Sequence, residues 1–442
     1  MFEPSPSDRT SAPRRARRPR LPKSGLWANL DFLHLWSAET ISQFGAQLSV
    51  VALPLLAVAE LDATPFQMGL LGTVGTLPYL LIGLLAGAWV DRMSKRTVML
   101  VTDLGRGIVL LAIPIAAALD QLSMWLLLTI AFVVGVQSVF FNAAYGALVP
   151  RIVPRDQLTD ANGKLLASSS ASQVIGPAIG GTLVALISGP LTMLINAVTF
   201  LGSAHFIRRI TPRPEMHASG ATRSLHREIR EGMHALVASP VLRSITLSTM
   251  MNNLAGYLFI AVYVLYMTDD LHLSDRGVGL VFASGGVGAL IGSLVAAPLT
   301  RRFGQGNTIV AASIGFGVSG LTVPMAILAP DHALPLVVFA EFAQWMTVVI
   351  FNTNRIALRQ ALTPDHLQGR VAASSQVITV GAQPIGSFLG GVIGSVWSVQ
   401  AALIVGVIGM FLAFLFVWFS PTRSMHDIPQ EPDPSLVALG ER

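Results

Sequence analysis

The stretch that decides the fold reads GLLAGAWVDRMSKRTVML, residues 83–100. Apolar, helix-like sequence leads into it and out of it, and the charged residues Asp91, Arg92, Lys95 and Arg96 are confined to the short break between. This pattern is typical of two membrane-spanning helices joined by a turn at the membrane surface. Topology explains the basic side chains, whereas Asp91 is an acid in a loop where positive charge is favoured.

The composition of the whole chain supports a membrane protein. Of its 442 residues, 52% are hydrophobic and only 12% are charged, whereas soluble domains carry roughly 25% charged residues. The net charge of +5 would point to nucleic acid in a soluble protein, but here the placement of the charges matters more, and we expect no nucleic-acid partner. The absence of cysteine excludes disulfides and thiolate metal sites, and we expect no metal.

Apolar segments long enough to cross a membrane recur along the chain, and a spanning helix needs about 20 mostly apolar residues. The segments are long and do not alternate, which favours helices over barrel strands. We predict twelve spans, near 29–59, 66–90, 97–119, 122–145, 162–187, 190–208, 241–268, 276–300, 307–329, 333–354, 371–395 and 398–420.

The basic residues are distributed asymmetrically between the connections. If the N-terminus lies inside, all but two of the 29 Lys and Arg residues fall on the cytoplasmic side; the exceptions are Arg106, within the third span, and Arg276. Acids mark the outer connections: Glu60, Asp62, Asp120, Asp269, Asp270, Asp275 and Asp331. This asymmetry predicts a multi-pass protein of the inner or plasma membrane with both termini cytoplasmic.

The ends of the chain are polar. Residues 1–27 are expected to form a disordered basic cytoplasmic tail, which either holds the topology or is attracted to anionic lipid headgroups. Residues 421–442 are expected to form a cytoplasmic C-tail.

The two halves of the chain match at one offset of 210 residues. This offset aligns several spans without gaps, and it places the following residues on one another: Asn142 on Asn352, Pro154 on Pro364, Gly180–Gly181 on Gly390–Gly391, and Gly69 on Gly279. We therefore predict two homologous six-helix bundles, 28–208 and 239–420, related by an axis along the membrane normal. The linker 209–238 contains LHREIREGMHAL, whose apolar face predicts an amphipathic helix on the cytoplasmic membrane surface; the alternative is an ordinary solvated linker helix.

Twelve spans in two halves resemble the major facilitator superfamily. The opening stretch is similar to that family's loop motif: Gly87-x-x-x-Asp91-Arg92-x-Ser94-Lys95-Arg96, with Ser94 where the family has glycine. The second half carries a decayed copy, Arg301-Arg302-Phe303-Gly304, without the acid. The resemblance implies an all-α membrane protein of two pseudo-symmetric six-helix bundles, the major facilitator fold.

A second motif resembles the fifth span of proton-coupled exporters. It comprises Gly163, Ser172 in place of a glycine, Gly176-Pro177 and Gly180-Gly181. The phrases FNAAYGALVPRIVP and LHREIREGMHALVASPVLRSI also resemble the branch that contains enterobactin-type and macrolide-type exporters. Small residues allow close helix packing and proline permits a bend. We expect Gly176, Pro177, Gly180 and Gly181 to form a tight, bendable interface between the fifth helix and its partner across the halves.

The resemblance also implies a role for the loop acid. In the family this aspartate engages the opposite half and holds the inside closed, so Asp91 and Arg92, with Lys95 and Arg96, are predicted to act as a conformational latch. Asp103 and Arg106 lie one turn apart and are able to join that network or to form a purely local ion pair. Arg106 is too costly to face lipid unpaired.

Two acids inside spans are candidates for proton coupling, Glu39 in the first and Glu341 in the tenth. An ionisable group at such depth is a functional candidate by default, and a buried carboxyl is able to bind a proton and release it when its surroundings open. The alternative is an acid exposed to water near a helix end.

Polar and aromatic residues in the first, fourth, seventh and tenth spans are candidates for the substrate cavity, which those spans line in the family. They are Gln43, Gln47, Gln137, Asn142, Asn252, Asn253, Tyr257, Gln344 and Trp345. Apolar cavities with scattered amides suit amphipathic organic molecules.

Enzyme motifs are absent from the sequence: no G-x-x-x-x-G-K-[ST], H-E-x-x-H or G-x-S-x-G occurs. We therefore expect a monomeric transporter without cofactors, in which a proton gradient rather than ATP drives the efflux of small amphipathic molecules. The alternatives are a proton symporter or facilitator that imports a metabolite, and a membrane sensor on a transporter fold that does not transport.

Overall fold

The computed structural model describes residues 25–212, 225–427, 429 and 431–436, and these residues contain helices and no strand. Most of the predicted basic tail and part of the linker, residues 1–24 and 213–224, lie outside this part of the chain. Within it, twelve helical spans are long and apolar enough to cross a membrane. The helices are α1 (Leu30–Leu61), α2 (Pro65–Asp91), α3 (Lys95–Ala118), α4 (Met124–Ile152), α5 (Leu158–Ile187), α6 (Gly189–Arg208), α7 (Leu225–Ala238), α8 (Pro240–Leu265), α9 (Asp275–Phe303), α10 (Gln305–Met325), α11 (Ala333–Leu362), α12 (Gln368–Val396), α13 (Val399–Leu412) and α14 (Phe414–Trp418).

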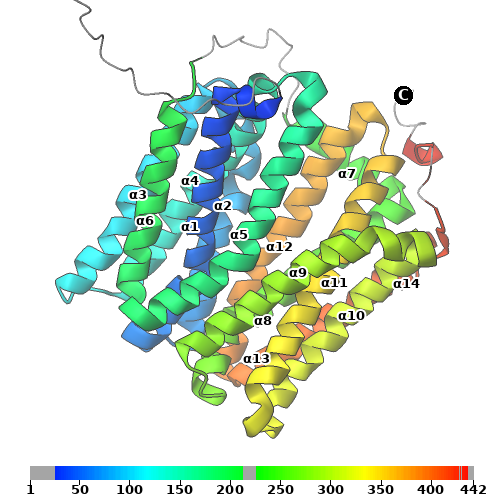
Figure 1. Cartoon of the computed structure of the whole chain (residues 1–442). Helices are drawn as coiled ribbons and strands as arrows, with labels where there is room; N and C mark the ends of the chain where they lie inside the picture. Colours follow the sequence, from blue (N-terminus) through cyan, green and yellow to red (C-terminus); the bar gives the residue numbers. More distant parts are fainter. Residues whose placement is uncertain (1–24, 213–224, 428, 430, 437–442) are drawn as a thin grey trace, which may run out of the picture.

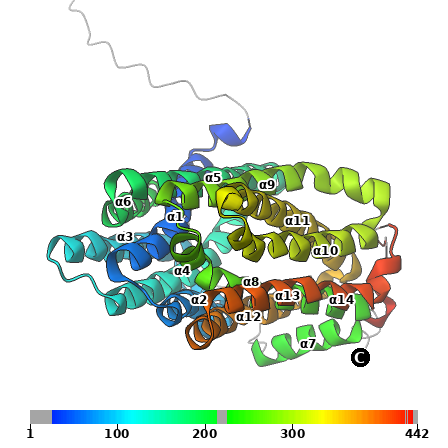
Figure 2. The same cartoon turned by 90° about the horizontal axis from the view of Figure 1, so that it is seen from below.

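The helices form two bundles that lie side by side (Figures 1 and 2). Helices α1–α6 make the N-terminal bundle and α8–α14 make the C-terminal bundle, in which α13 and α14 together complete the last span. The first turn of α1 and residues 421–427, 429 and 431–436 lie at one end of the molecule, which we call the terminal face; the opposite end is the far face. The predicted fold class, two pseudo-symmetric six-helix bundles in a membrane, is confirmed.

Two contacts between glycines join the bundles near the far face. Gly181 of α5 lies against Gly279 of α9, and Gly391 of α12 lies against Gly69 of α2, so closely that a Cβ atom at any of them would overlap the partner's backbone. An offset of 210 residues carries Gly181 onto Gly391 and Gly69 onto Gly279. The repeat read from the sequence is thus also a repeat of the interface between the bundles.

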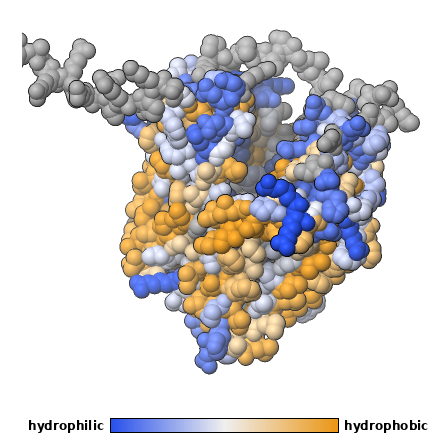
Figure 3. Space-filling model, turned by 45° about the vertical axis from the view of Figure 1, so that its right-hand side comes forward, coloured by the Kyte–Doolittle hydropathy of each residue, from blue (hydrophilic) through white to orange (hydrophobic). Residues whose placement is uncertain are grey.

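The bundles part toward the terminal face. The close contacts between α2 and α12 involve residues 65–80 and 381–394, among them the hydrogen bond that Thr73 Oγ1 donates to the carbonyl of Pro384 at 3.2 Å. The remaining turns of α2 lead to the terminal face, where Trp89 and Met93 are exposed. Figure 3 shows the surface hollowed between the two bundles at this end. The structure is therefore closed at the far face and open at the terminal face.

Two helices are longer than predicted. Helices α4 and α11 continue to Ile152 and Leu362, several residues beyond the predicted span ends at 145 and 354. Helix α4 ends just before Val153-Pro154, and α11 ends just before Thr363-Pro364. A residue that precedes proline is driven out of the helical region of backbone conformation, so each helix stops there. Hydropathy predicted the apolar part of each span, and the two helices extend past it.

The linker helix and the C-terminal segment pack on the terminal face of the C-terminal bundle. Helix α7 lies against α12 and α8, and Glu231 of α7 forms an ion pair with Arg370 at 2.5 Å. Further along the chain, Asp433 accepts a hydrogen bond from Ser239 Oγ at 2.5 Å. Burial opposes ionisation of the Asp433 carboxyl, but hydrogen bonds from Ser239 and Ser435 outweigh it and lower its pKa.

Substitution of Gly181 by leucine is expected to shift the protein away from this arrangement. The side chain would collide with the backbone of Gly279, and overpacking of this kind costs about 1–3 kcal/mol. Only the arrangement that is closed at the far face bears that cost. Its population therefore falls roughly 5- to 150-fold relative to the arrangement that is open at the far face. The chain has no cysteine, so spin labels at Thr97→Cys and Asn307→Cys measure the opening at the terminal face, and the distance between them is expected to shorten.

The control for this experiment is Val198→Phe, which adds bulk on an exposed face of α6. It is expected to leave the distance between the labels unchanged. A Gly181→Leu protein with the same distance as the parent would contradict the inferred role of the glycine contact.

Candidate functional site

A buried ion pair lies in the interior of the N-terminal bundle. Asp103 and Arg106 lie one turn apart on α3, and an Arg106 Nη atom donates to the Asp103 carboxylate. The second Asp103 oxygen accepts a hydrogen bond from Ser203 Oγ of α6 at 2.5 Å. The guanidinium lies between the rings of Phe141 and Phe200, 4.3 and 4.5 Å from their centroids, and this geometry adds cation–π attraction on both of its faces.

Glu39 brings a second carboxyl to this cluster from α1. Its side chain is 5% exposed, and Gln43 Nε2 donates to Oε1 at 2.7 Å. Oε2 has no hydrogen-bond partner among the residues that the structure describes. The charge of Glu39 is close enough to interact with those of Asp103 and Arg106. Two acids and one base carry a single negative charge, unless a proton or a cation neutralises it.

The depth of the cluster within the bundle raises the free-energy cost of an uncompensated charge there. Glu39 and Asp103 lie nine and eight residues from the terminal-face ends of α1 and α3, or about 12–14 Å along each helix. The hydrocarbon core is about 30 Å thick, so the cluster lies near its middle, where an uncompensated charge is costly. The site is suited to binding one proton or one positively charged group. The structure places Asp103 and Arg106 here, rather than beside the loop at residues 91–96.

The C-terminal bundle holds a simpler carboxyl site. Glu341 of α11 is buried, and Trp345 Nε1, one turn away, donates to its Oε1 at 2.8 Å. The hydroxyl of Tyr263 lies beside the carboxyl, outside good hydrogen-bond geometry. Gly285 of α9 provides the room, since a Cβ atom there would press on both Trp345 and Glu341. Within the described part of the chain no cation interacts with Glu341, whereas Arg106 interacts with Glu39.

The predicted cavity residues divide between the two bundles. In the N-terminal bundle, Gln43 binds Glu39, and Gln47 packs on Gly176. Gln137 packs against Gly105, and its Oε1 is buried without a partner among the described residues. These three side chains support the bundle interior in this arrangement.

In the C-terminal bundle, Asn252 and Asn253 line a small cavity of about 70 Å³ between α8, α10 and α11. Asn253 also donates to the carbonyl of Thr379 at 2.7 Å. Gln344 is buried, whereas Trp345 is exposed and still donates to Glu341.

One cluster of predicted residues does reach across the bundles. Asn142 Nδ2 donates to the hydroxyl of Tyr79 on α2 at 3.0 Å, and Tyr79 is close enough to Tyr257 of α8 for their hydroxyl groups to interact electrostatically. Tyr79 also interacts with the charge of Arg106. The tyrosines therefore connect the space between the bundles with the buried charges.

The loop at residues 91–96 makes its contacts within the N-terminal bundle. Lys95 is buried and its Nζ donates to the carbonyl of Asp91 at 2.7 Å, while Arg96 donates to the carbonyl of Arg208 at 2.5 Å. Asp91 and Arg92 are exposed at the open terminal face. In this arrangement the proposed latch would be disengaged, and its role stays a prediction.

The glycines of the fifth-span motif face two different helices. Gly176 and Gly180 pack on Gln47 and Leu48 of α1, within the N-terminal bundle. Of these glycines, Gly181 is the one that meets the opposite bundle, at Gly279. Pro177 lies inside α5. The predicted cross-bundle interface thus rests on Gly181, and the other two glycines hold α5 against α1.

Neutralising Asp91 is expected to lower transport roughly tenfold, because an ion pair or capping contact of the carboxylate in the closed state is worth about 1–2 kcal/mol. Asp91→Asn should insert and accumulate normally. The measurement is initial transport rate per inserted protein, with Asp120→Asn, an exposed acid between α3 and α4, as control. Unchanged transport in Asp91→Asn would refute the latch.

Sequence reasoning missed several residues of the site. Ser203, Phe200 and Tyr79 border the charged cluster and lie outside every motif that the sequence offered. Phe141 is the first residue of FNAAYGALVPRIVP, a stretch that indicated a branch of exporters but not a contact with Arg106. The one available signal was Arg106 itself, since a buried arginine requires partners from neighbouring helices.

Comparisons with known proteins agree with a transporter. A family described as transmembrane secretion effector matches residues 26–438. The multidrug efflux pump Tap of Mycolicibacterium fortuitum is 26% identical over 400 residues, which cover 88% of this chain and 95% of that protein. Macrolide efflux protein A of Streptococcus pyogenes is 24% identical over 374 residues, covering 81% and 88%. The crystal structure of a bacterial homologue of the iron transporter ferroportin in an inward-facing state has a TM-score of 0.70 at 18% identity, covering 89% of this chain and 99% of that one.

Proposed function

Because the chain belongs to the transmembrane secretion effector family of the major facilitator superfamily, we propose that it is a secondary transporter that exports small amphipathic organic molecules in exchange for protons. The efflux pumps among its relatives support the direction of transport. The proton gradient supplies the energy, no cofactor takes part, and the monomer is the working unit.

The charge asymmetry of the connections supports an orientation in the cell membrane with both termini in the cytoplasm. In that orientation the open terminal face is the cytoplasmic face, and the structure is inward-open. The glycine pairs Gly181–Gly279 and Gly69–Gly391 then close the outer side. Alternating access requires that these contacts separate while the cytoplasmic ends of α2, α5, α9 and α12 come together.

The observation that carries the proposal is the composition of the charged cluster around Glu39. Arg106 is already paired with Asp103, and Glu39 keeps one carboxylate oxygen without a partner among the described residues. A single negative charge near the membrane middle is satisfied either by a proton or by a positively charged substrate group. Because the cluster holds either the proton or the substrate group and not both, the entry of a proton is coupled to the exit of substrate, which is antiport.

Inverted membrane vesicles test the direction and the coupling together. When respiration or ATP hydrolysis acidifies their interior, an exporter accumulates substrate inside as the gradient forms, and a protonophore abolishes the accumulation. A proton symporter does not accumulate substrate under these conditions. No transport of any compound in a broad screen with reconstituted protein would favour the sensor instead. An efflux screen in a deletion strain supplies the compounds to test.

A further inference from the structure

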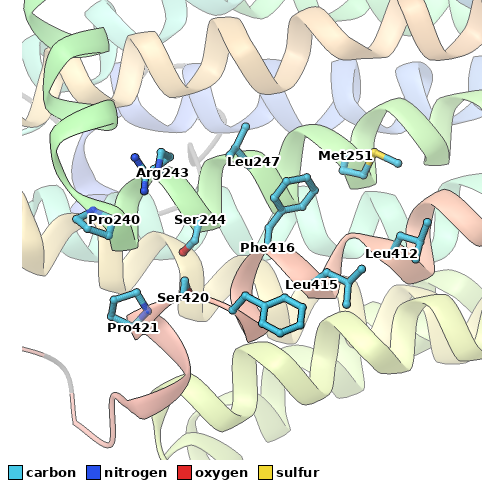
Figure 4. A pocket seen from close by; sticks show the side chains of 11 residues that line it. Pro240, Arg243, Ser244, Leu247, Met251, Leu412, Leu415, Phe416, Ser420 and Pro421 are labelled. Carbon is cyan, nitrogen blue, oxygen red and sulfur yellow. The ribbon is translucent and has the colours of Figure 1, made fainter.

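A crevice lies at the perimeter of the C-terminal bundle, between the first turns of α8 and the span formed by α13 and α14 (Figure 4). Its volume is about 590 Å³, within the range of small-molecule sites. The rim side chains Leu412, Phe416 and Phe419 are exposed. Helices α13 and α14 pack chiefly on α8, α10 and α12, so the crevice opens to the surroundings of the bundle and not to the space between the bundles.

The lining changes from polar to apolar along the crevice. At the terminal-face end lie Arg243, whose side chain is exposed, and Ser420. Ser244 Oγ and Thr422 Oγ1 are 2.9 Å apart and join the two walls there. Further along α8 and the span formed by α13 and α14 the lining is apolar: Leu247, Met251, Leu412 and Leu415. This gradient matches a molecule with an anionic head and a hydrocarbon tail.

The position of the crevice matches one leaflet of the bilayer. Arg243 and Met251 are eight residues apart, or about 12 Å along a helix, and one leaflet contributes about half of the 30 Å hydrocarbon core. At the polar end, Arg423 stacks on Trp418, with 3.8 Å between the guanidinium carbon and the ring centroid. Tryptophan is enriched at headgroup level, so Arg243 lies where lipid phosphates lie.

We propose that this crevice binds an anionic phospholipid of the surrounding bilayer. Its phosphate accepts charge-assisted hydrogen bonds from the Arg243 guanidinium, and an acyl chain fills the apolar part between Leu247 and Leu412. A free phosphate lacks the apolar contacts, and a lipid without net charge leaves the positive charge of Arg243 uncompensated. The bound lipid fixes α8, which carries Asn252 and Tyr257, against the last span.

The test uses the full chain in nanodiscs of phosphatidylcholine that contain a minor share of phosphatidylglycerol. After extraction, native mass spectrometry counts the lipids that each protein retains. Phosphatidylglycerol is expected to be retained in preference to phosphatidylcholine. Arg243→Gln should lower its retention roughly tenfold, and Leu412→Trp, which fills the apolar part, should lower it as well. The matched control is Arg302→Gln, an exposed arginine near the same face outside the crevice.

Three results would overturn the proposal. Equal retention of phosphatidylglycerol by Arg243→Gln and the parent would exclude the head site, and an equal loss in Arg302→Gln would show general surface attraction. Displacement of the lipid by inorganic phosphate or by a transported compound would show that the occupant is a free anion or a substrate. Thermal unfolding of each variant verifies that it is folded.

Discussion

Glu39→Gln is expected to abolish concentrative, proton-driven transport and to leave downhill equilibration of substrate intact. Glutamine keeps an oxygen that accepts the hydrogen bond from Gln43, but it neither binds nor releases a proton. The cluster with Asp103 and Arg106 then stays neutral throughout the cycle, so the proton gradient has no group on which to act. Inverted vesicles measure accumulation with the gradient, and the same vesicles with protonophore measure downhill flux.

The matched control is Glu60→Gln, an exposed acid near the end of the same helix, which is expected to accumulate substrate as the parent does. Concentrative transport that persists in Glu39→Gln would remove this residue from the coupling step. Loss of accumulation in Glu341→Gln with an active Glu39→Gln would instead assign coupling to the C-terminal bundle.

Arg106→Leu is expected to lower the free energy of unfolding by about 3 kcal/mol, because removal of one partner leaves the buried Asp103 carboxylate without compensation. The double variant Asp103→Asn/Arg106→Leu removes both charges and should recover most of that loss. The pair thus differs from an exposed ion pair, whose removal changes stability little. Denaturant titration of purified protein in detergent measures the free energy of unfolding of the parent, of Arg106→Leu and of the double variant.

The control for the Arg106 series is Arg276→Leu, an exposed arginine at the start of α9, which is expected to change stability by no more than about 0.5 kcal/mol. If Arg106→Leu and the double variant are equally destabilised, the loss comes from the packing of Phe141 and Phe200 on the guanidinium rather than from the buried charge.

The backbone conformation at Ser94 explains why serine is able to replace the glycine of the related motif. The related motif has glycine there, yet Ser94 has a φ of −63°, a conformation that any residue adopts. Its side chain accepts a hydrogen bond from the backbone N–H of Thr97 at 3.4 Å and caps α3. Serine therefore provides a helix cap at a turn that does not need the freedom of glycine.

The amino-acid sequence by itself determined the topology. In a membrane every backbone polar group needs a partner within its own segment, so long apolar runs must be helices, and their number and order follow from hydropathy. The internal repeat likewise predicted which glycines correspond, and the structure places Gly181 and Gly391 in equivalent contacts with Gly279 and Gly69.

The tertiary structure alone decided which side chains meet and which face is open. Asp103 and Arg106 were visible as a pair, but Glu39, Ser203, Phe141 and Phe200 come from three other helices. Hydropathy places a residue at a depth in the membrane and leaves the rotation of its helix undetermined, because rotation depends on packing against neighbours. The opening at the terminal face depends on the free-energy difference between two arrangements of the same two bundles. That difference arises from contacts between many segments, so it is not read from any single segment of the sequence.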